Sequence, residues 1–157
     1  MRSSILSLLS LVTASPIAVL GDSKAYLETA KGEYLSYTTV SRGAMIGLVV
    51  DKESSATKAL VNEKGLLEIE VDTSFVALTL TNLYGGPGNL SEVLFAYETP
   101  TTGFAFSKNG SLTLSQSGFH GFFACEEQDT GKQLYWAAKS TQAPKTCEAV
   151  SFAKAAA

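Results

Sequence analysis

The sequence predicts an all-β fold, a small antiparallel sandwich or barrel with one disulfide. Turn-forming residues recur roughly every 8–12 residues, and short alternating runs of apolar and polar residues lie between them. No segment longer than about 10 residues combines helical spacing of apolar side chains with capping residues. A β-trefoil is the alternative, because the pattern at Lys64–Ile69 returns at Asn109–Leu114. A trefoil needs three copies, and no convincing third copy is present.

Residues 1–21 are predicted to be a secretory signal peptide. A basic start at Met1–Arg2 precedes the Leu-rich run Ile5–Val12, and small residues follow. The run is too short to span a bilayer, which needs about 20 apolar residues. The alternative is a buried N-terminal helix. Cleavage is expected between residues 14 and 21, which makes residues 22–157 a single β-rich secreted domain.

The net charge of the domain limits the classes of partner that it could bind. The formal net charge is -3, and loss of Arg2 with the signal peptide makes it about -4. An acidic domain is poorly suited to bind nucleic acid or anionic lipid. The C-terminus lacks the apolar tail of a glycolipid-anchor signal, so no membrane anchor is expected.

Cys125 and Cys147 are the two cysteines of the chain and are expected to form a disulfide. Secretion places them in an oxidising compartment, and closing a loop of this size stabilises a fold by about 3 kcal/mol. A metal site needs more ligands than the single His120 can add. A reactive thiol pair is the alternative, but the spacing is far from that of a Cys-x-x-Cys motif.

The first two thirds of the domain read as a series of short strands. Leu67, Ile69 and Val71 alternate with Glu68 and Glu70, which predicts one buried and one solvated face. The predicted strands occupy residues 33–40, 45–50, 57–61, 67–71, 75–81 and 92–97, and a further strand or arm lies within residues 22–32. Residues 51–55 and the Gly/Pro segment 85–88 are predicted to be loops.

The last third begins with a predicted hairpin. Residues 104–106 and 112–114 alternate on either side of Asn109-Gly110, a pair that favours a tight turn with positive φ angles. Three further strands are expected at residues 119–125, 134–136 and 147–152.

The order of these motifs resembles a known family. The runs Gly103–Leu114, Phe122–Cys125, Leu134–Trp136 and Cys147–Val150 are similar to the C-terminal domain of fungal PIR-type cell wall proteins. They are equally similar to fungal cell wall proteins related to PhiA. The resemblance extends from about Gly85 to the C-terminus and implies a cell wall or extracellular role. PIR proteins also carry repeats with a Gln that is esterified to glucan, and this sequence contains no such repeat.

No catalytic constellation is visible in the sequence, and neither enzymatic activity nor a cofactor is expected. His120 lies at the edge of an aromatic run, and no Gly-x-Ser-x-Gly elbow is present. The acid pairs Glu68/Glu70 and Glu126/Glu127 could serve glycoside hydrolysis. The first pair is predicted to lie on the solvent-exposed face of a strand, and the second pair is predicted to lie in a solvent-exposed turn. A hydrolase with carboxylates from distant strands remains an alternative.

Binding to glycans is the stronger alternative to a purely structural role. Tyr135 and Trp136 point to opposite faces of one predicted strand, so one could be exposed and contact a sugar ring. The opposing interpretation packs Trp136 on the disulfide and leaves Tyr135 at an edge. Asn89 and Asn109 begin N-glycosylation sequons. The sequence thus predicts a secreted, non-enzymatic fungal cell wall or extracellular protein, with wall polysaccharide as a possible partner and a carbohydrate-binding module or effector as the alternative.

Overall fold

The computed structural model describes residues 23–40, 43–138 and 143–156. The predicted signal peptide, residues 1–21, lies outside the described residues. Within the described ranges no helix is long and apolar enough to cross a membrane.

The strands confirm an all-β antiparallel fold and make it a barrel. In the described part of the chain, seven strands form a closed ring in the order β1-β2-β3-β7-β6-β5-β4. These strands are β1 (Ala25–Glu28), β2 (Tyr34–Thr39), β3 (Met45–Val50), β4 (Lys58–Val61), β5 (Leu67–Val71), β6 (Ser74–Tyr84) and β7 (Ser91–Ala96). Met45 opposite Phe95 and Ile46 opposite Leu94 close the ring between β3 and β7. This order contains no three-fold repeat, so the trefoil alternative is not supported.

The strands after β7 add to the barrel beside β3 and β7, the two strands that close the ring. They are β8 (Phe104–Phe106), β9 (Leu112–Leu114), β10 (Phe122–Glu127), β11 (Gly131–Trp136), β12 (Cys147–Val150) and β13 (Ala153–Lys154). Strand β11 pairs with both β3 and β7, and β10 lies between β11 and β12. Strands β8 and β9 form the predicted hairpin. The predicted loop at residues 51–55 contains the short 3-10 helix η2 (Glu53–Ser55), and the short 3-10 helix η3 (Pro87–Asn89) begins in the predicted loop 85–88 and ends one residue beyond it.

The barrel interior holds the main core. Leu67 and Ile69 of β5 are buried, whereas Glu68 and Glu70 are partly exposed on the outer side, as the alternation predicted. The main core is lined by aliphatic and aromatic residues, among them Leu27, Leu35, Val49, Val76, Leu78, Val93, Phe95, Leu134 and Phe152. Burial of these side chains supplies the principal stabilisation of the fold.

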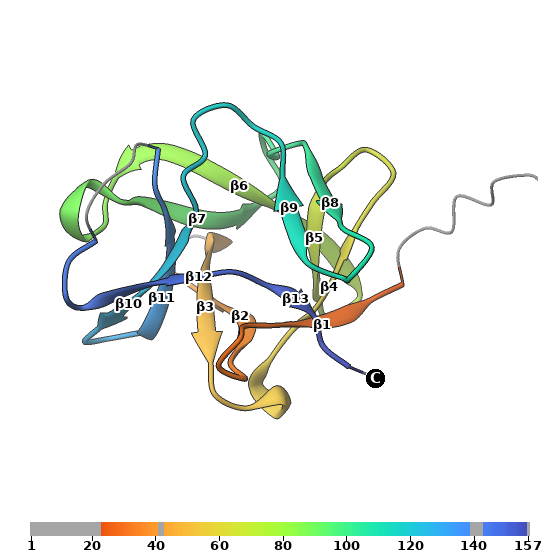
Figure 1. Cartoon of the computed structure of the whole chain (residues 1–157), viewed down its shortest axis with the longest axis horizontal. Coiled ribbons are helices and arrows are strands. Elements are labelled where there is room, and N and C mark those ends of the chain that lie inside the picture. The colour runs from red at the N-terminus through yellow and green to blue at the C-terminus, as the bar shows by residue number, and fades with distance from the viewer. Residues whose placement is uncertain (1–22, 41–42, 139–142, 157) are drawn as a thin grey trace, which may run out of the picture.

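The C-terminal segment crosses the barrel from one side to the other (Figure 1). Strand β12 pairs with β10, and then the buried Phe152 accepts a 2.8 Å hydrogen bond from the backbone N–H of Leu112. Beyond it β13 pairs with β1, where the N–H of Ala155 donates to the carbonyl of Tyr26 at 2.8 Å. The strand predicted at residues 147–152 therefore ends early, at Val150, and a further short strand, β13, follows after Phe152 enters the core.

The sequence pattern shared by Lys64–Ile69 and Asn109–Leu114 corresponds to a turn of the same type in both places. Among the described residues, Thr29–Glu33, Asn62–Leu66 and Ser107–Ser111 make the same backbone bonds. In each of these five-residue turns, the backbone N–H of the first residue donates to the carbonyl of the fifth residue. The N–H of the glycine at the fourth position donates to the carbonyl of the first residue. The first side-chain oxygen accepts from the fifth N–H, at 3.3, 3.1 and 3.2 Å respectively.

This geometry corrects the turn predicted at Asn109-Gly110. Gly110 has a φ of 84°, as expected, but Asn109 is not among the residues with positive φ. Its Oδ1 instead accepts a hydrogen bond from the N–H of Ser111 at 3.2 Å. The loop is longer than a two-residue hairpin turn, and the positive φ is confined to the glycine.

Candidate functional site

The predicted disulfide is present between Cys125 and Cys147. The two residues lie directly opposite each other on the neighbouring strands β10 and β12. The cysteine side of β10 is covered, because Cys125 is fully buried. The bridge therefore joins the barrel extension to the C-terminal segment that crosses the molecule.

Tyr135 and Trp136 do point to opposite faces of β11, but both are buried, with 3% and 4% of their surface exposed. Trp136 belongs to the main core, where its Nε1–H donates to the carbonyl of Thr81 at 2.9 Å and its ring stacks with Phe119. Tyr135 packs in the small cluster that contains Cys125. Both interpretations of this pair are thus wrong: neither ring is exposed, and Tyr135, not Trp136, lies on the disulfide side.

The Gly/Pro loop explains why Tyr135 is covered. A Cβ at Gly86 would lie 2.5 Å from Cδ1 of the Tyr135 ring, so only glycine allows this approach. The Tyr135 hydroxyl donates to Oε1 of Glu127 at 2.8 Å. Burial, and then this bond, raises the pKa of Tyr135 above its ordinary value. A buried and hydrogen-bonded hydroxyl of this kind fixes the strand and is not available to a ligand.

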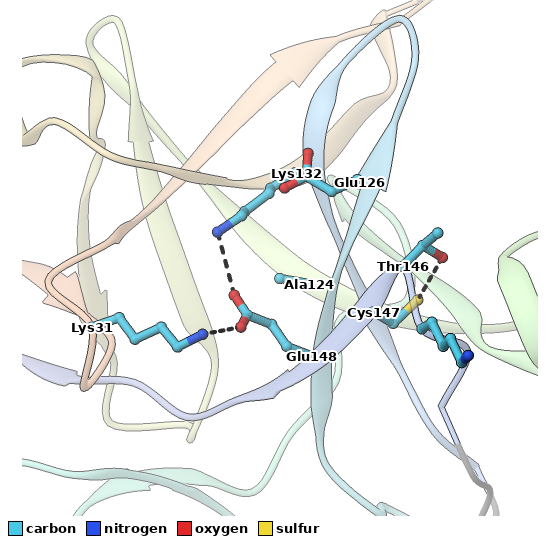
Figure 2. A pocket seen from close by; sticks show the side chains of 8 residues that line it. Lys31, Ala124, Glu126, Lys132, Thr146, Cys147 and Glu148 are labelled. Atoms are coloured by element: carbon cyan, nitrogen blue, oxygen red, sulfur yellow. Dashed lines mark hydrogen bonds and ion pairs between the residues drawn. The ribbon is translucent and has the colours of Figure 1, made fainter.

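A chain of four charged residues lies beside the disulfide and is here called the clasp: Lys31, Glu33, Lys132 and Glu148. Lys31 and Glu33 belong to the turn between β1 and β2, Lys132 to β11 and Glu148 to β12. Glu148 accepts from Lys31 through one oxygen and from Lys132 through the other, the latter at 3.3 Å (Figure 2). Lys132 also pairs with Oε1 of Glu33. Three segments distant in sequence are joined in this way.

The electrostatics of the clasp follow from its partial burial. The hydrogen bond to Glu33 raises the pKa of Lys132, burial opposes this, and the bond to Glu148 adds to it. The hydrogen bond from Lys31 lowers the pKa of Glu148, burial opposes it, and Lys132 lowers that pKa further. Glu33 is mostly buried, and its Oε2 has no partner among the described residues. Loss of Lys132 would therefore leave a buried carboxylate without compensation.

A hollow of about 240 Å³ lies next to the clasp, with Glu126, Lys145 and Thr146 on its walls (Figure 2). Glu148 in its wall is held by two lysines, so this carboxylate is not placed as a general acid or base. Among the described residues no group of three or more His, Cys, Asp or Glu could hold a metal. The ion pairs of the clasp therefore connect the β1–β2 turn to strands β11 and β12.

The other predicted site residues lie apart from one another. His120 is exposed, and its backbone N–H donates to the carbonyl of Ala137 at 2.8 Å. Glu68 accepts from the Asn62 amide at 3.1 Å, and Glu70 pairs with Lys24 at 2.8 Å. Glu126 and Glu127 lie in β10 rather than in the turn that was predicted.

The two sequons differ in their surroundings. Asn89 is exposed, but Leu90 and Ser91 are fully buried, and the Ser91 hydroxyl has no partner among the described residues. Asn109 is exposed at the tip of the β8–β9 hairpin.

Comparison with known proteins identifies the domain. The sequence model of a domain of unknown function (DUF7907) matches residues 18–156. The chain belongs to the DUF7907 family. No curated protein and no solved structure matches the chain. The DUF7907 match includes the barrel, the disulfide and the clasp, which places all of them within one family domain. The resemblance to PhiA-related and PIR-type proteins remains a prediction.

Sequence reasoning missed the clasp. Lys132 and Glu33 are 99 positions apart, and nothing in the local pattern around either residue marks it as paired. The available signal is weak: Glu33 follows a turn glycine and begins the predicted strand 33–40, whose alternation would place its side chain on the same face as Leu35.

Proposed function

We propose that this DUF7907 chain is a secreted, non-enzymatic structural protein of the fungal cell wall or extracellular matrix. The observation that carries the proposal is the Cys125–Cys147 disulfide, since structural disulfides form and persist in oxidising compartments. The signal-peptide pattern at residues 1–21 agrees with it. The cell wall location itself rests on the resemblance of the C-terminal third to PhiA-related and PIR-type proteins.

The state of the acidic residues supports a non-enzymatic role. Glu148 and Glu33 pair with lysines, and Glu127 accepts from the buried Tyr135 hydroxyl. Groups engaged in this way contribute to folding rather than to proton transfer. The exposed Asn109 suits a glycoprotein, because a glycan at a hairpin tip would project into solvent.

Fractionation of a fungal culture that expresses the epitope-tagged chain tests the proposal. We expect the protein in the medium or the wall extracts, with a new N-terminus between Ser15 and Asp22 and no thiol that reacts with maleimide before reduction. An Asn109→Gln variant controls for glycosylation and should migrate faster if that sequon is used. Cytosolic protein with an intact Met1 and two reactive thiols would contradict the proposal.

A second candidate function is binding of wall or host glycans. The buried Tyr135 and Trp136 do not support it. The observation that favours it is a separate groove, lined almost entirely by polar residues of β1, β2, β4, β5 and the segment around η2.

A further inference from the structure

A groove of about 450 Å³ lies between β1, β2, β4, β5 and the segment around η2, and it shares no lining residue with the clasp. Pockets of roughly 300–1,000 Å³ are the usual size for bound small molecules. Nine of its ten lining residues carry a hydroxyl, an amino group or a carboxylate, and the tenth is Ala56. Such a wall suits a ligand with many hydroxyl groups and not an apolar one.

Part of this polar wall is used to build the groove. The Ser36 hydroxyl donates to the carbonyl of Ser55 at 2.7 Å, and the Thr57 hydroxyl donates to the carbonyl of Glu70 at 2.8 Å. These bonds hold the η2 segment against β2 and β5. The walls are therefore fixed before any ligand arrives, which reduces the entropy cost of binding.

Another part has no protein partner. The hydroxyl groups of Tyr26, Tyr37 and Ser54 make no hydrogen bond among the described residues, and all three residues line the groove, where the Tyr37 ring also packs against the main core. Asp72 at the end of the groove also makes no ion pair within the described chain. Hydroxyls can donate and accept, and the carboxylate accepts. Together they match the alternating donors and acceptors of a polyol.

Two aromatic residues lie along this part of the barrel: Tyr26 lines the groove, and Phe75 lies one strand beyond the lining residue Glu70. Tyr26 of β1 is paired with Lys58 of β4, whose Nζ lies 5.6 Å from the ring centroid. Glu70 of β5 is paired with Phe75 of β6, and Phe75 is 40% exposed. The two rings are three strand spacings apart, each of about 4.8 Å. A single sugar ring is much shorter than this, so a ligand touching both rings must be an oligomer.

The charges of the groove favour a neutral ligand. Glu70 and Asp72 are negative, Lys58 is positive, and Lys24 at the border pairs with Glu70 at 2.8 Å. The charges nearly cancel, and the two carboxylates oppose a sulfated or phosphorylated chain. An apolar peptide anchor would find no apolar pocket among these residues.

We propose that this groove binds a neutral polysaccharide chain, with Tyr26 and Phe75 packing against sugar rings. In this arrangement Tyr37, Ser54 and Asp72 bind the sugar hydroxyls. The inference deepens the glycan-binding candidate and rests on the proposed extracellular role for the kind of polymer that the protein meets.

Calorimetric titration of the purified mature protein with laminarihexaose and with chitohexaose tests the groove. We expect saturable binding of at least one hexasaccharide, and an affinity at least tenfold lower in Tyr26→Ala. The Asp72→Asn substitution should lower the affinity about threefold. This variant should fold normally, because Asn tolerates the φ of 54° at that position. Tyr97→Ala is the matched control, since Tyr97 is 74% exposed and does not line the groove.

Absence of binding to both hexasaccharides by the wild-type protein would overturn the inference. Equal loss in Tyr97→Ala and Tyr26→Ala, or tighter binding of heparin than of either neutral chain, would overturn it as well. If Tyr26→Ala does not fold, the double variant Tyr37→Phe with Ser54→Ala removes two of the hydroxyls assigned to sugar binding with little change of shape, and an unchanged affinity in it would overturn the inference. Wild-type protein that enters the wall fraction but binds neither chain would refute the groove and leave the proposed location intact. Cytosolic protein would refute the location alone.

Discussion

The clasp and the groove are both polar regions on the surface of one small barrel, and they differ in whether their side chains already have partners. In the clasp, Lys132 and Glu148 each contact two oppositely charged residues, and Cys147 beside them is bonded to Cys125. In the groove, the hydroxyls of Tyr26, Tyr37 and Ser54 have no partner among the described residues. Polar groups that pair with one another stabilise a fold, whereas solvent-accessible polar groups without a protein partner can exchange water for a ligand. Changes in the clasp should therefore affect stability, and changes in the groove should affect binding.

The largest effect is expected from the disulfide. Replacing both cysteines, Cys125→Ser with Cys147→Ser, should lower the free energy of unfolding by about 3 kcal/mol, because the unfolded chain regains the entropy of an open loop. Urea denaturation of the oxidised wild type and the variant measures the difference. Limited proteolysis should also reveal a new cleavage site between residues 143 and 150, while the buried Phe152 keeps β13 attached. A loss below about 1 kcal/mol would mean that the disulfide is not the main source of stability in this region.

The next effect is expected from the ion pairs. Lys132→Met should lower the free energy of unfolding by about 2 kcal/mol, since it leaves Glu33 buried without a cation. The value lies below that of a fully buried pair because the Lys132 side chain is 25% exposed. Lys31→Met is the matched control: its side chain is 69% exposed, and the loss should stay below about 0.5 kcal/mol. Equal losses in the two variants would mean that burial does not distinguish these lysines.

The pH dependence of stability should show a smaller effect of the same clasp. The lowered pKa of Glu148 stabilises the fold above the ordinary glutamate value of about 4.3, and this contribution is lost as the pH falls through the lowered pKa. The raised pKa of Lys132 stabilises the fold below about 10.4, and this contribution is lost as the pH rises through the raised pKa. Urea denaturation at a series of pH values should show both limbs. Glu148→Gln should weaken the acid limb, and an unchanged acid limb would exclude Glu148 as its cause.

The smallest effect on stability is expected in the groove. Asp72→Asn and Ser54→Ala should change the free energy of unfolding by less than about 0.5 kcal/mol, because both side chains are exposed and make no bond within the described chain. Thermal unfolding followed by circular dichroism measures this. A loss above 1 kcal/mol in either variant would show that the groove, like the clasp, is part of the framework.

The sequence predicted the strands well because their signals are local. The alternation around Ile69 and the apolar run from Met45 mark strands β5 and β3 within a residue of their bounds. The run predicted from Phe119 was placed too early, because β10 begins at Phe122. Aromatic composition alone did not distinguish the strand from the turn before it.

The candidate site was harder to predict because it depends on long-range pairing. The closure of the barrel between β3 and β7, and the position of β10 between β11 and β12, have no signature in short windows. Without them, the exposure of Tyr135 could not be judged. Gly86 has a φ of -100°, so its lack of a side chain is required by the Tyr135 ring and not by its backbone angle, and the Gly/Pro composition of the loop does not reveal this contact.

The C-terminal segment that crosses the barrel has a consequence for the order of biosynthesis. Strand β13 pairs with β1, and β12 carries the second cysteine, so residues 147–155 complete contacts made by the first strand and by β10. Ribosomes extend a chain by about 5–20 residues per second, so Leu27 and Glu28 of β1 lack this partner until β13 is made, whereas Ala25 and Tyr26 can already pair with β4. The seven-strand ring can close earlier, when β7 pairs with β3, so the crossing segment docks onto a barrel that has already formed, and the Cys125–Cys147 disulfide then fixes β12 to β10.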